Sequence, residues 1–173
     1  QRQMCIRDRL SDAEGDVPEG VLALLRLAAL CTDGTVREEN GTEIPVGDPT
    51  ETAIVACALH HGLRKEELTA EHPRVGEIPF DSDRKMMTVV GGMGSRHRVF
   101  TKGAPDEVLQ RCAWMELEGC RVELTEARRQ EILAANQAMA GRALRVLCAA
   151  CRIWDSVPAD TSPANLEREL TFL

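Results

Sequence analysis

The stretch that decides the fold is Pro79-Phe-Asp-Ser-Asp-Arg-Lys-Met-Met-Thr-Val-Val90, in which a polar run separates two apolar ones. Residues 75–80 and 85–90, on either side of that run, are rich in Val, Ile, Phe, Met and Thr, a composition typical of strands. Residues 98–102 repeat it beyond Gly91-Gly-Met-Gly94, which we expect to form a hairpin tip. Strands joined by so short a connection are antiparallel. The stretch therefore predicts the centre of an antiparallel sheet.

On the N-terminal side, residues 21–30 place leucine and alanine at helical spacing and predict a buried helix. After a turn at Asp33-Gly34, residues 35–45 carry Asn40-Gly41, a dipeptide typical of tight hairpin turns. We expect a short hairpin there. Residues 1–17 lack a periodic pattern, and we interpret them as a tail outside the fold.

A second helix is expected from Asp48 to Gly62. Asp48 suits the N-cap, and Pro49 suits the first helical position. Glu51 stands where a capping box requires an acidic residue, so a structural role in the cap is one interpretation of this side chain.

The C-terminal half repeats such signals. We expect a short helix over Pro105–Cys112, a turn at Glu118-Gly119 and a helix capped by Thr125 that runs to Ala140. Residues 144–153 are almost continuously apolar and predict a buried strand.

These elements predict an α+β fold over residues 18–155, with a central, mostly antiparallel sheet flanked by helices. Residues 156–173 contain Pro158, Asp160 and Pro163, and we interpret them as an exit linker. The 173 residues are consistent with a single domain.

Composition excludes several classes of function. The net charge of −7 and the scarcity of aromatic residues argue against a nucleic-acid partner, which needs a basic surface or stacking platforms. The longest apolar run, residues 21–31, is broken by Arg26 and is too short to insert directly into a membrane. The seven cysteines have no regular spacing, and we expect them to be reduced thiols.

A cationic window breaks this acidic trend. Residues 84–105 contain five Lys or Arg and no Asp or Glu. One interpretation is that the window is an ordinary solvated strand pair whose cations are paired with acidic residues from elsewhere in the fold. Alternatively, the window forms a local site for an anion such as a phosphate-bearing ligand.

Two residue groups in or beside the window admit both interpretations. Gly103, directly after Lys102, would let a ligand approach the backbone closely, although Gly and Pro105 also explain a plain turn. Phe80 suits the core at a strand end, but an exposed ring beside cations would stack on an adenine base. Asp81 and Asp83 alone make a weak metal site.

Arg145 interrupts the apolar run of residues 143–150. A guanidinium within a buried strand must be paired, either with an acidic side chain or with a phosphate group. No P-loop, dinucleotide fingerprint, nucleophile elbow or zinc helix occurs in the sequence, and no nucleophile has an adjacent base.

Taken together, four motifs resemble the nucleotide-binding domain of P-type cation-transporting ATPases and follow the order of that family. They are GDPTETA at 47–53, PFDSDRKMMTVV at 79–90, KGAPDEVLQRC at 102–112 and ALRVLCAA at 143–150. The flanking residues 24–34 and 166–173 resemble the family's first helix and its return strand, so that the resemblance covers residues 18–173. The first two motifs are most like the calcium and sodium/potassium branch.

The resemblance implies roles for individual residues at the adenine end of ATP. Phe80 would stack on the adenine, Glu51 would hydrogen-bond near the base, and Met87 would pack at the pocket wall. Ser82 departs from calcium-pump relatives that place an Arg two residues after the Phe. A phosphate contact made there in those relatives is not expected here.

Toward the phosphates, the resemblance implies that Lys85 and Lys102 line the site and that Gly103 permits close approach. Arg145 would reach the phosphates, and Leu147 would contact the nucleotide from the same strand. One stacked base contributes about 1–3 kcal/mol and one charge-assisted hydrogen bond about 1.5–3 kcal/mol. Association costs roughly 4–15 kcal/mol, so we expect ATP affinity in the millimolar range.

The function implied is to position ATP so that its γ-phosphate reaches the Asp of a separate phosphorylation domain during ion transport. Mg²⁺ would be held mainly by that domain, and the partners would be the phosphorylation and actuator domains of a parent pump. The family's DKTGT motif is absent from these 173 residues, so we expect no ATP turnover by the chain alone. The resemblance places the domain on the cytoplasmic side of an integral membrane protein. The alternative is a non-catalytic interaction module with a degenerate nucleotide pocket.

Overall fold

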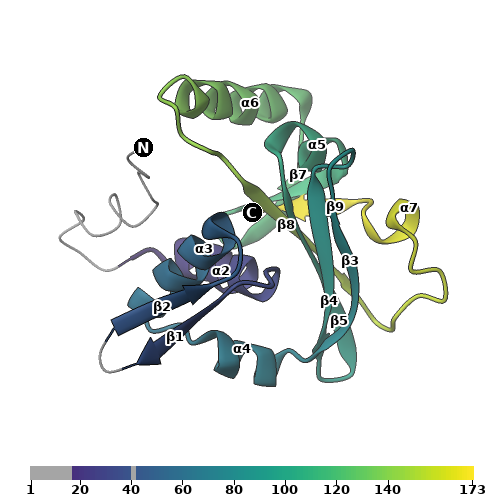
Figure 1. Cartoon of the computed structure of the whole chain (residues 1–173). Helices are drawn as coiled ribbons and strands as arrows, with labels where there is room; N and C mark the ends of the chain where they lie inside the picture. Colours follow the sequence, from purple (N-terminus) through teal and green to yellow (C-terminus); the bar gives the residue numbers. More distant parts are fainter. Residues whose placement is uncertain (1–16, 40–41) are drawn as a thin grey trace. The chain divides into compact units, whose positions relative to one another are not determined.

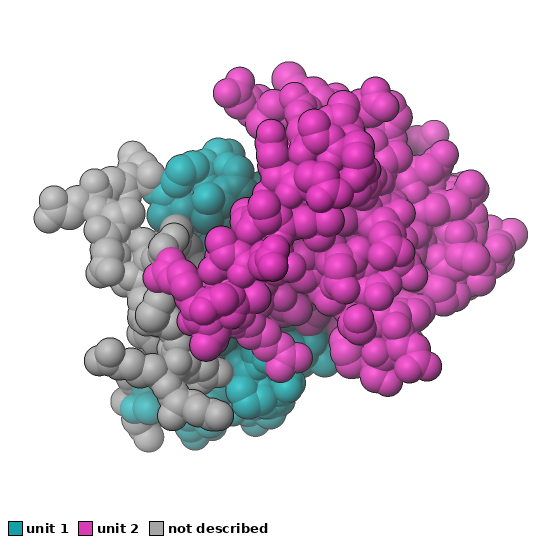
Figure 2. Space-filling view, turned by 90° about the horizontal axis from the view of Figure 1, so that it is seen from above, with its two compact units in different colours: residues 1–71 teal, residues 72–173 magenta. Residues whose placement is uncertain are grey.

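The structure is a computed structural model that describes residues 17–39 and 42–173. Most of the predicted tail, residues 1–16, and the Asn40-Gly41 dipeptide lie outside the described residues. The chain divides into two compact units, Gln1–Glu71 and His72–Leu173, which Figure 2 shows in different colours. Each unit is described by itself below.

The first unit consists of helices and a small hairpin (Figure 1). Its elements are α2 (Glu19–Leu30), β1 (Thr35–Glu39), β2 (Thr42–Val46), α3 (Pro49–His60) and α4 (Lys65–Glu71). The strands β1 and β2 pair antiparallel, as the sequence predicts. Leu25 and Ala29 of α2 and Val55 and Ala58 of α3 are buried, because each helix turns its apolar side inward. The short helix α4 was not predicted.

Asp48 and Pro49 begin α3 as the sequence predicts. The Asp48 side chain accepts hydrogen bonds from the backbone N–H groups of Thr50 (2.8 Å) and Glu51 (3.3 Å), and Pro49 occupies the first turn. Gly62 follows the helix with a φ of +76°, a conformation that glycine adopts without steric cost. The residues that begin and end this helix therefore match the prediction.

The second unit is built on a seven-stranded sheet in the order β3-β4-β5-β8-β9-β6-β7. All neighbouring strands are antiparallel except β6 and β9, which are parallel. The α+β class with a mostly antiparallel sheet is therefore confirmed. The strands are β3 (Arg74–Asp81), β4 (Met86–Met93), β5 (Arg96–Gly103), β6 (Cys112–Leu117), β7 (Cys120–Glu123), β8 (Cys148–Trp154) and β9 (Leu170–Phe172), and the helices are α5 (Pro105–Gln110), α6 (Glu126–Ala140) and α7 (Pro163–Leu166).

Two strand boundaries differ from the sequence prediction. The β4–β5 hairpin turns at residues 94–95, and Gly91 and Gly92 lie within β4. A Cβ built at Gly91 would come within 2.9 Å of Phe100 Cε2, so close packing of that ring explains the glycine. The predicted strand over 144–153 begins only at Cys148. An apolar run specifies burial, but it does not specify the residue at which pairing starts.

The C-terminal segment contributes to this sheet. Residues 156–173, interpreted from the sequence as an exit linker, contain α7 and β9, and β9 lies between β8 and β6. Leu166 and Leu170 are fully buried. The position of the domain boundary stays a prediction, but the last strand is an integral part of the second unit.

The core of the second unit gathers along β4. Met86 packs with Val108, Leu109 and Leu170, and Val90 packs with Leu166 in a neighbouring cluster. Burying such side chains stabilises the fold by about 1.5–3 kcal/mol each. Among the described residues, no helix is long and apolar enough to cross a membrane.

Candidate nucleotide site

The polar residues of the 79–90 motif form a tight turn between β3 and β4. The Asp81 side chain accepts hydrogen bonds from the backbone N–H groups of Asp83 (3.0 Å) and Arg84 (2.8 Å). The Lys85 N–H donates to the Asp81 carbonyl at 2.7 Å. Asp81 is thus a turn-forming residue, which accounts for an acidic residue at this position without a metal. Within residues 17–39 and 42–173, no group of three or more His, Cys, Asp or Glu could hold a metal ion.

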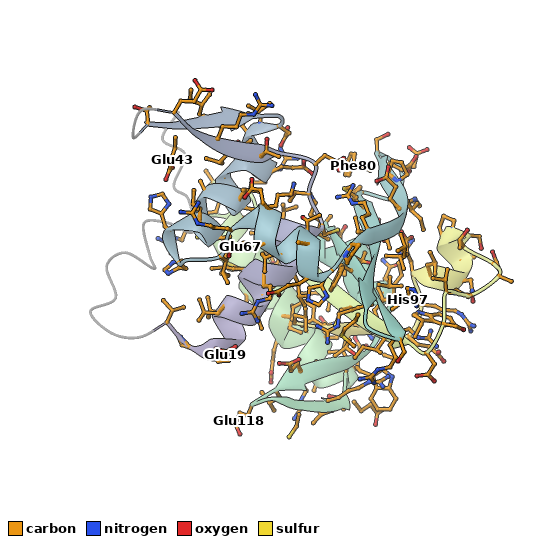
Figure 3. All side chains as sticks on the ribbon, turned by 90° about the horizontal axis from the view of Figure 1, so that it is seen from below. Glu19, Glu43, Glu67, Phe80, His97 and Glu118 are labelled. Atoms are coloured by element: carbon orange, nitrogen blue, oxygen red, sulfur yellow. The ribbon has the colours of Figure 1, made fainter. Side chains whose placement is uncertain are left out.

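Phe80 is exposed at the end of β3. Its relative exposure is 62%, and β3 is an edge strand of the sheet. Figure 3 labels this residue. The interpretation of Phe80 as a core residue is therefore wrong, because large apolar side chains in a core lose nearly all contact with water. Its ring is available to a stacking ligand, which stays a prediction.

Lys85 is held beside two carboxylates. Its Nζ lies 3.7 Å from Asp106 Oδ2 and 3.5 Å from Glu107 Oε1, both in the first turn of α5. The Lys85 side chain is half exposed, so the ammonium group is accessible to solvent. Arg84 also has an acidic partner, Glu167. Acidic residues outside the cationic window thus neutralise two of its five cations, in line with the structural interpretation of the window.

Met87 and Lys102 are brought together by strand pairing. They face each other in the register of β4 and β5, and Ala149 of β8 pairs with Lys102 on the other side. Paired residues in antiparallel strands point to the same side of a sheet. Met87 and Lys102 are 2% and 8% exposed, so the lysine is a rare buried cation.

Close packing within the protein explains why residue 103 is a glycine. A Cβ at this position would come within 2.4 Å of the Lys85 carbonyl oxygen and 2.6 Å of Met86 Cβ. The next residue, Ala104, donates its N–H to the same carbonyl at 3.0 Å. The backbone of Lys85 and Met86, at the start of β4, therefore approaches Gly103 closely. This contact joins the Asp81–Lys85 turn to the end of β5.

Arg145 and Leu147 do not lie on a strand, contrary to the sequence interpretation. They precede β8 in a segment without regular structure, and Arg145 is exposed. An exposed guanidinium does not require the buried partner that the strand assignment demanded. Leu147 is 37% exposed. This segment leads into Cys148, which pairs with Gly103. Arg145 and Leu147 therefore precede the strand end that pairs with Lys102 and Gly103.

Glu51 belongs to the first unit, unlike the other predicted site residues. Its Oε2 accepts hydrogen bonds from the backbone N–H groups of Asp33 (2.9 Å) and Gly34 (2.8 Å). The carboxylate therefore fastens the turn between α2 and β1. A Cβ at Gly34 would come within 2.9 Å of Glu51 Cβ, which explains the glycine in that turn.

The second unit thus collects most of the predicted residues at one end of three strands. Phe80 precedes the turn from β3 to β4 and Lys85 is its last residue. Met87, Lys102 and Gly103 lie where β4 pairs with the end of β5. Figure 3 labels Phe80 at this end and His97 near the opposite hairpin turn. An exposed aromatic ring and a solvent-accessible cation suit a ligand with a base and a phosphate chain.

Three cysteines, Cys112, Cys148 and Cys151, have raised pKa values, which is the opposite of what a reactive thiol needs. Burial raises the pKa of the Cys112 thiol to about 12, with a smaller opposing effect from Arg129. Burial also raises the pKa of Cys148 and Cys151. A thiol with a raised pKa is a poor nucleophile. None of the six cysteines in the described part of the chain forms a disulfide. The reduced state of the thiols stays a prediction.

The chain is similar to known proteins over almost all of its length. The family profile described as P-type ATPase, cytoplasmic domain N, matches residues 20–173. A calcium-transporting ATPase of Bacillus cereus is 39% identical over 150 residues, and one of Listeria monocytogenes is 36% identical over 151. A sodium/potassium exporting P-type ATPase of Schizosaccharomyces pombe is 31% identical over 164 residues.

The three matches cover 87%, 87% and 90% of this chain, respectively, but only 16%, 16% and 15% of the relatives. The chain thus corresponds to one part of much longer proteins. The matched residues, 20–173, include all four motifs, the second unit and the first unit from residue 20 onward. This chain belongs to the family of the cytoplasmic N domain of P-type ATPases.

Proposed function

We propose that this chain binds ATP for a P-type cation-transporting ATPase and positions it so that the γ-phosphate reaches an Asp of a separate phosphorylation domain. The observation that carries the proposal is the exposure of Phe80 at the end of β3, together with the half-exposed Lys85 in the turn that follows. On a family member with this motif, we infer that the exposed ring stacks on the base of the nucleotide, because aromatic side chains are suited to stacking on nucleobases.

In this proposal the base end of ATP is bound by Phe80, with Met87 forming the wall beneath. The role of Glu51 near the base remains what the family resemblance implies. Lys85, Lys102 and Arg145 supply positive charge along the phosphate chain, and Gly103 and Leu147 shape the site. A bound Mg²⁺ would neutralise phosphate charge. The residues proposed to touch ATP in this chain provide no carboxylate cluster for it, and we assign its ligands mainly to the phosphorylation domain.

The proposed chemistry needs positioning rather than a nucleophile from this chain. Phosphoryl transfer is accelerated mainly by alignment of the reacting groups and by charge stabilisation. Holding ATP by its adenine end leaves the γ-phosphate free to reach a nucleophile supplied elsewhere. We therefore expect the chain to bind ATP without hydrolysing it.

The relatives also suggest the cargo and the partners of the parent protein. Two of them are named calcium-transporting, and one is named sodium/potassium exporting. We propose a cation pump of this kind, embedded in a membrane, with the phosphorylation and actuator domains as intramolecular partners. Calcium is the ion favoured by the bacterial names.

An amide NMR titration with ATP, repeated with GTP, tests the proposal. We expect shifts at Phe80, Lys85, Lys102 and Arg145 that saturate at lower concentrations of ATP than of GTP. Absence of shifts up to several millimolar ATP would contradict it. That outcome would favour an interaction module that keeps the fold with a degenerate pocket, to which the Ser82 departure already points.

A further inference from the structure

A buried carboxylate follows α7 in the C-terminal segment. The Glu167 side chain is 1% exposed, and its Oε1 accepts a hydrogen bond from Arg84 Nη1 at 2.5 Å and another from Thr88 Oγ1 at 2.7 Å. A buried charge is costly unless it is paired and hydrogen-bonded. Here both conditions are met by residues of the 79–90 motif, about 80 positions earlier in the chain.

Arg84 connects this carboxylate to the turn that carries the proposed site. Its Nη2 donates to the carbonyl of Pro79 at 2.8 Å, directly before Phe80, and its own backbone N–H donates to the Asp81 side chain. Lys85 follows it immediately. The guanidinium therefore fixes the backbone ahead of Phe80, while the Arg84 backbone is part of the turn itself.

The network continues into the strand that carries Lys102. Thr88 Oγ1 lies 2.9 Å from Thr101 Oγ1, and both threonines are almost completely buried. A buried polar network in which every partner is satisfied is rigid. The turn, β4, β5 and the C-terminal segment are thus held by one set of hydrogen bonds.

The turn needs such support. Lys85 has a φ of +54°, a conformation that costs a non-glycine residue energy and persists only where surrounding contacts impose it. Its carbonyl is held by Ala104, and its neighbour Arg84 is held by Glu167. Loss of the ion pair would leave the strained residue with fewer constraints.

We propose that Arg84 and Glu167 are positioning residues for the nucleotide site. Their ion pair holds residues 81–85 in the conformation that presents Phe80 and Lys85, and it couples that turn to the C-terminal segment, residues 163–172. The inference rests on the proposed function, although neither residue touches the nucleotide in that proposal. Because coupling between sites is reciprocal, bound ATP also stabilises the C-terminal segment.

The test compares Glu167→Gln with Glu169→Gln in the purified chain. Glu169 is a matched control, since its carboxylate pairs with Arg152 at 2.9 Å in the same segment but is 56% exposed. Amide hydrogen exchange is measured first without nucleotide, and ATP affinity is then measured by NMR titration. We expect faster exchange at residues 83–85 and a Kd raised on the order of 2- to 30-fold in Glu167→Gln only.

A further readout separates positioning from a purely structural role. In the wild-type chain, saturating ATP should slow amide exchange at Leu166 to Leu170, and Glu167→Gln should abolish that slowing. If Glu167→Gln fails to fold, Thr88→Val removes a single hydroxyl partner and should give the same pattern more weakly. The double variant Arg84→Gln/Glu167→Gln should weaken ATP binding no more than Arg84→Gln alone, which removes both the ion pair and the bond to the Pro79 carbonyl.

Three outcomes overturn the inference: wild-type exchange at residues 83–85 in Glu167→Gln, equal effects in Glu169→Gln, or additive losses in the double variant. A wild-type chain that binds no ATP would instead overturn the proposed function. In that case the exchange measured without nucleotide still decides whether the ion pair holds the turn.

Discussion

The neighbouring strands β3 and β4 both contain strand-forming apolar residues, but their surroundings are opposite. Residues 86–91 of β4 are all buried, whereas β3 is an edge strand that exposes Val75 and Phe80 by 54% and 62%. β4 is paired on both sides and covered by core residues. The comparison shows that the two ends of the 79–90 motif have different roles. The β4 residues form part of the core, whereas Phe80 at the end of β3 is exposed to solvent.

The largest expected effect tests the burial of β4. Met86→Ala should lower the free energy of unfolding by about 2–5 kcal/mol, because it removes a fully buried side chain and leaves a cavity. Urea denaturation measures this change. Val75→Ala in β3 is the matched control and should stay within about 0.5 kcal/mol of the wild type. Similar losses in both variants would remove the contrast between the strands.

Gly103→Ala should have the next largest effect. The added Cβ would collide with the Lys85 carbonyl and with Met86, and such overpacking costs about 1–3 kcal/mol. Gly76→Ala in β3 is the control, since its Cβ would meet only Val90 at 3.7 Å. Equal stability of the two alanine variants in urea would show that the approach at Gly103 is not tight.

Burial also predicts how stability depends on pH. The pKa of Cys112 is about 12 in the folded chain and near 9 when exposed, so the unfolded state loses this proton first as pH rises. Stability from the buried thiol is complete below pH 9 and falls above it, by about 1.4 kcal/mol per pH unit. The pKa values of Cys148 and Cys151 are also raised by burial, so these thiols add to the fall in the same direction. Urea denaturation at pH 8, 9 and 10 should show the summed slope.

Cys112→Ala should make the slope shallower by about 1.4 kcal/mol per pH unit and leave the part contributed by Cys148 and Cys151. Cys120→Ser, at an exposed position, should leave the slope unchanged. A wild-type stability that is constant from pH 8 to 10 would refute the burial of the thiol.

The smallest expected effect concerns the charge of the exposed turn after β3, which carries Lys85. Asp106→Asn removes a carboxylate 3.7 Å from Lys85 Nζ, so the ammonium group should attract ATP phosphates more strongly. Surface ion pairs contribute about 0.2–1 kcal/mol, which corresponds to a Kd lowered roughly 1.5- to 5-fold. Glu118→Gln changes the net charge equally at the β6–β7 turn and should have no effect. Equal gains in both variants would indicate a general charge effect.

The sequence predicted local features better than it predicted exposure. The caps at Asp48 and Thr125 and the hairpin of β4 with β5 formed as expected, because each depends on residues close together in the chain. Whether Phe80 is buried depends on β3 being an edge strand, which composition does not reveal. Strand pairing also starts later than the apolar run at residues 144–147 indicates, which leaves Arg145 exposed.

Contacts distant in sequence could not be predicted at all. The site residues around Lys85 followed from the motif and the family resemblance, but the carboxylates that flank its ammonium group did not. The partner of Arg84 lies 83 residues further along the chain, in a segment interpreted as a linker. No local signal marks such a pair, since the sequence shows only two ordinary charged residues.

The most direct test of the central claim measures stability and ATP affinity together in Phe80→Ala. An exposed ring contributes little to folding, so the urea midpoint should match that of the wild type. Loss of stacking worth about 1–3 kcal/mol should weaken ATP binding roughly 5- to 150-fold in the same sample. An unchanged affinity, or a loss of stability as large as that of Met86→Ala, would contradict the assignment of Phe80 to nucleotide binding.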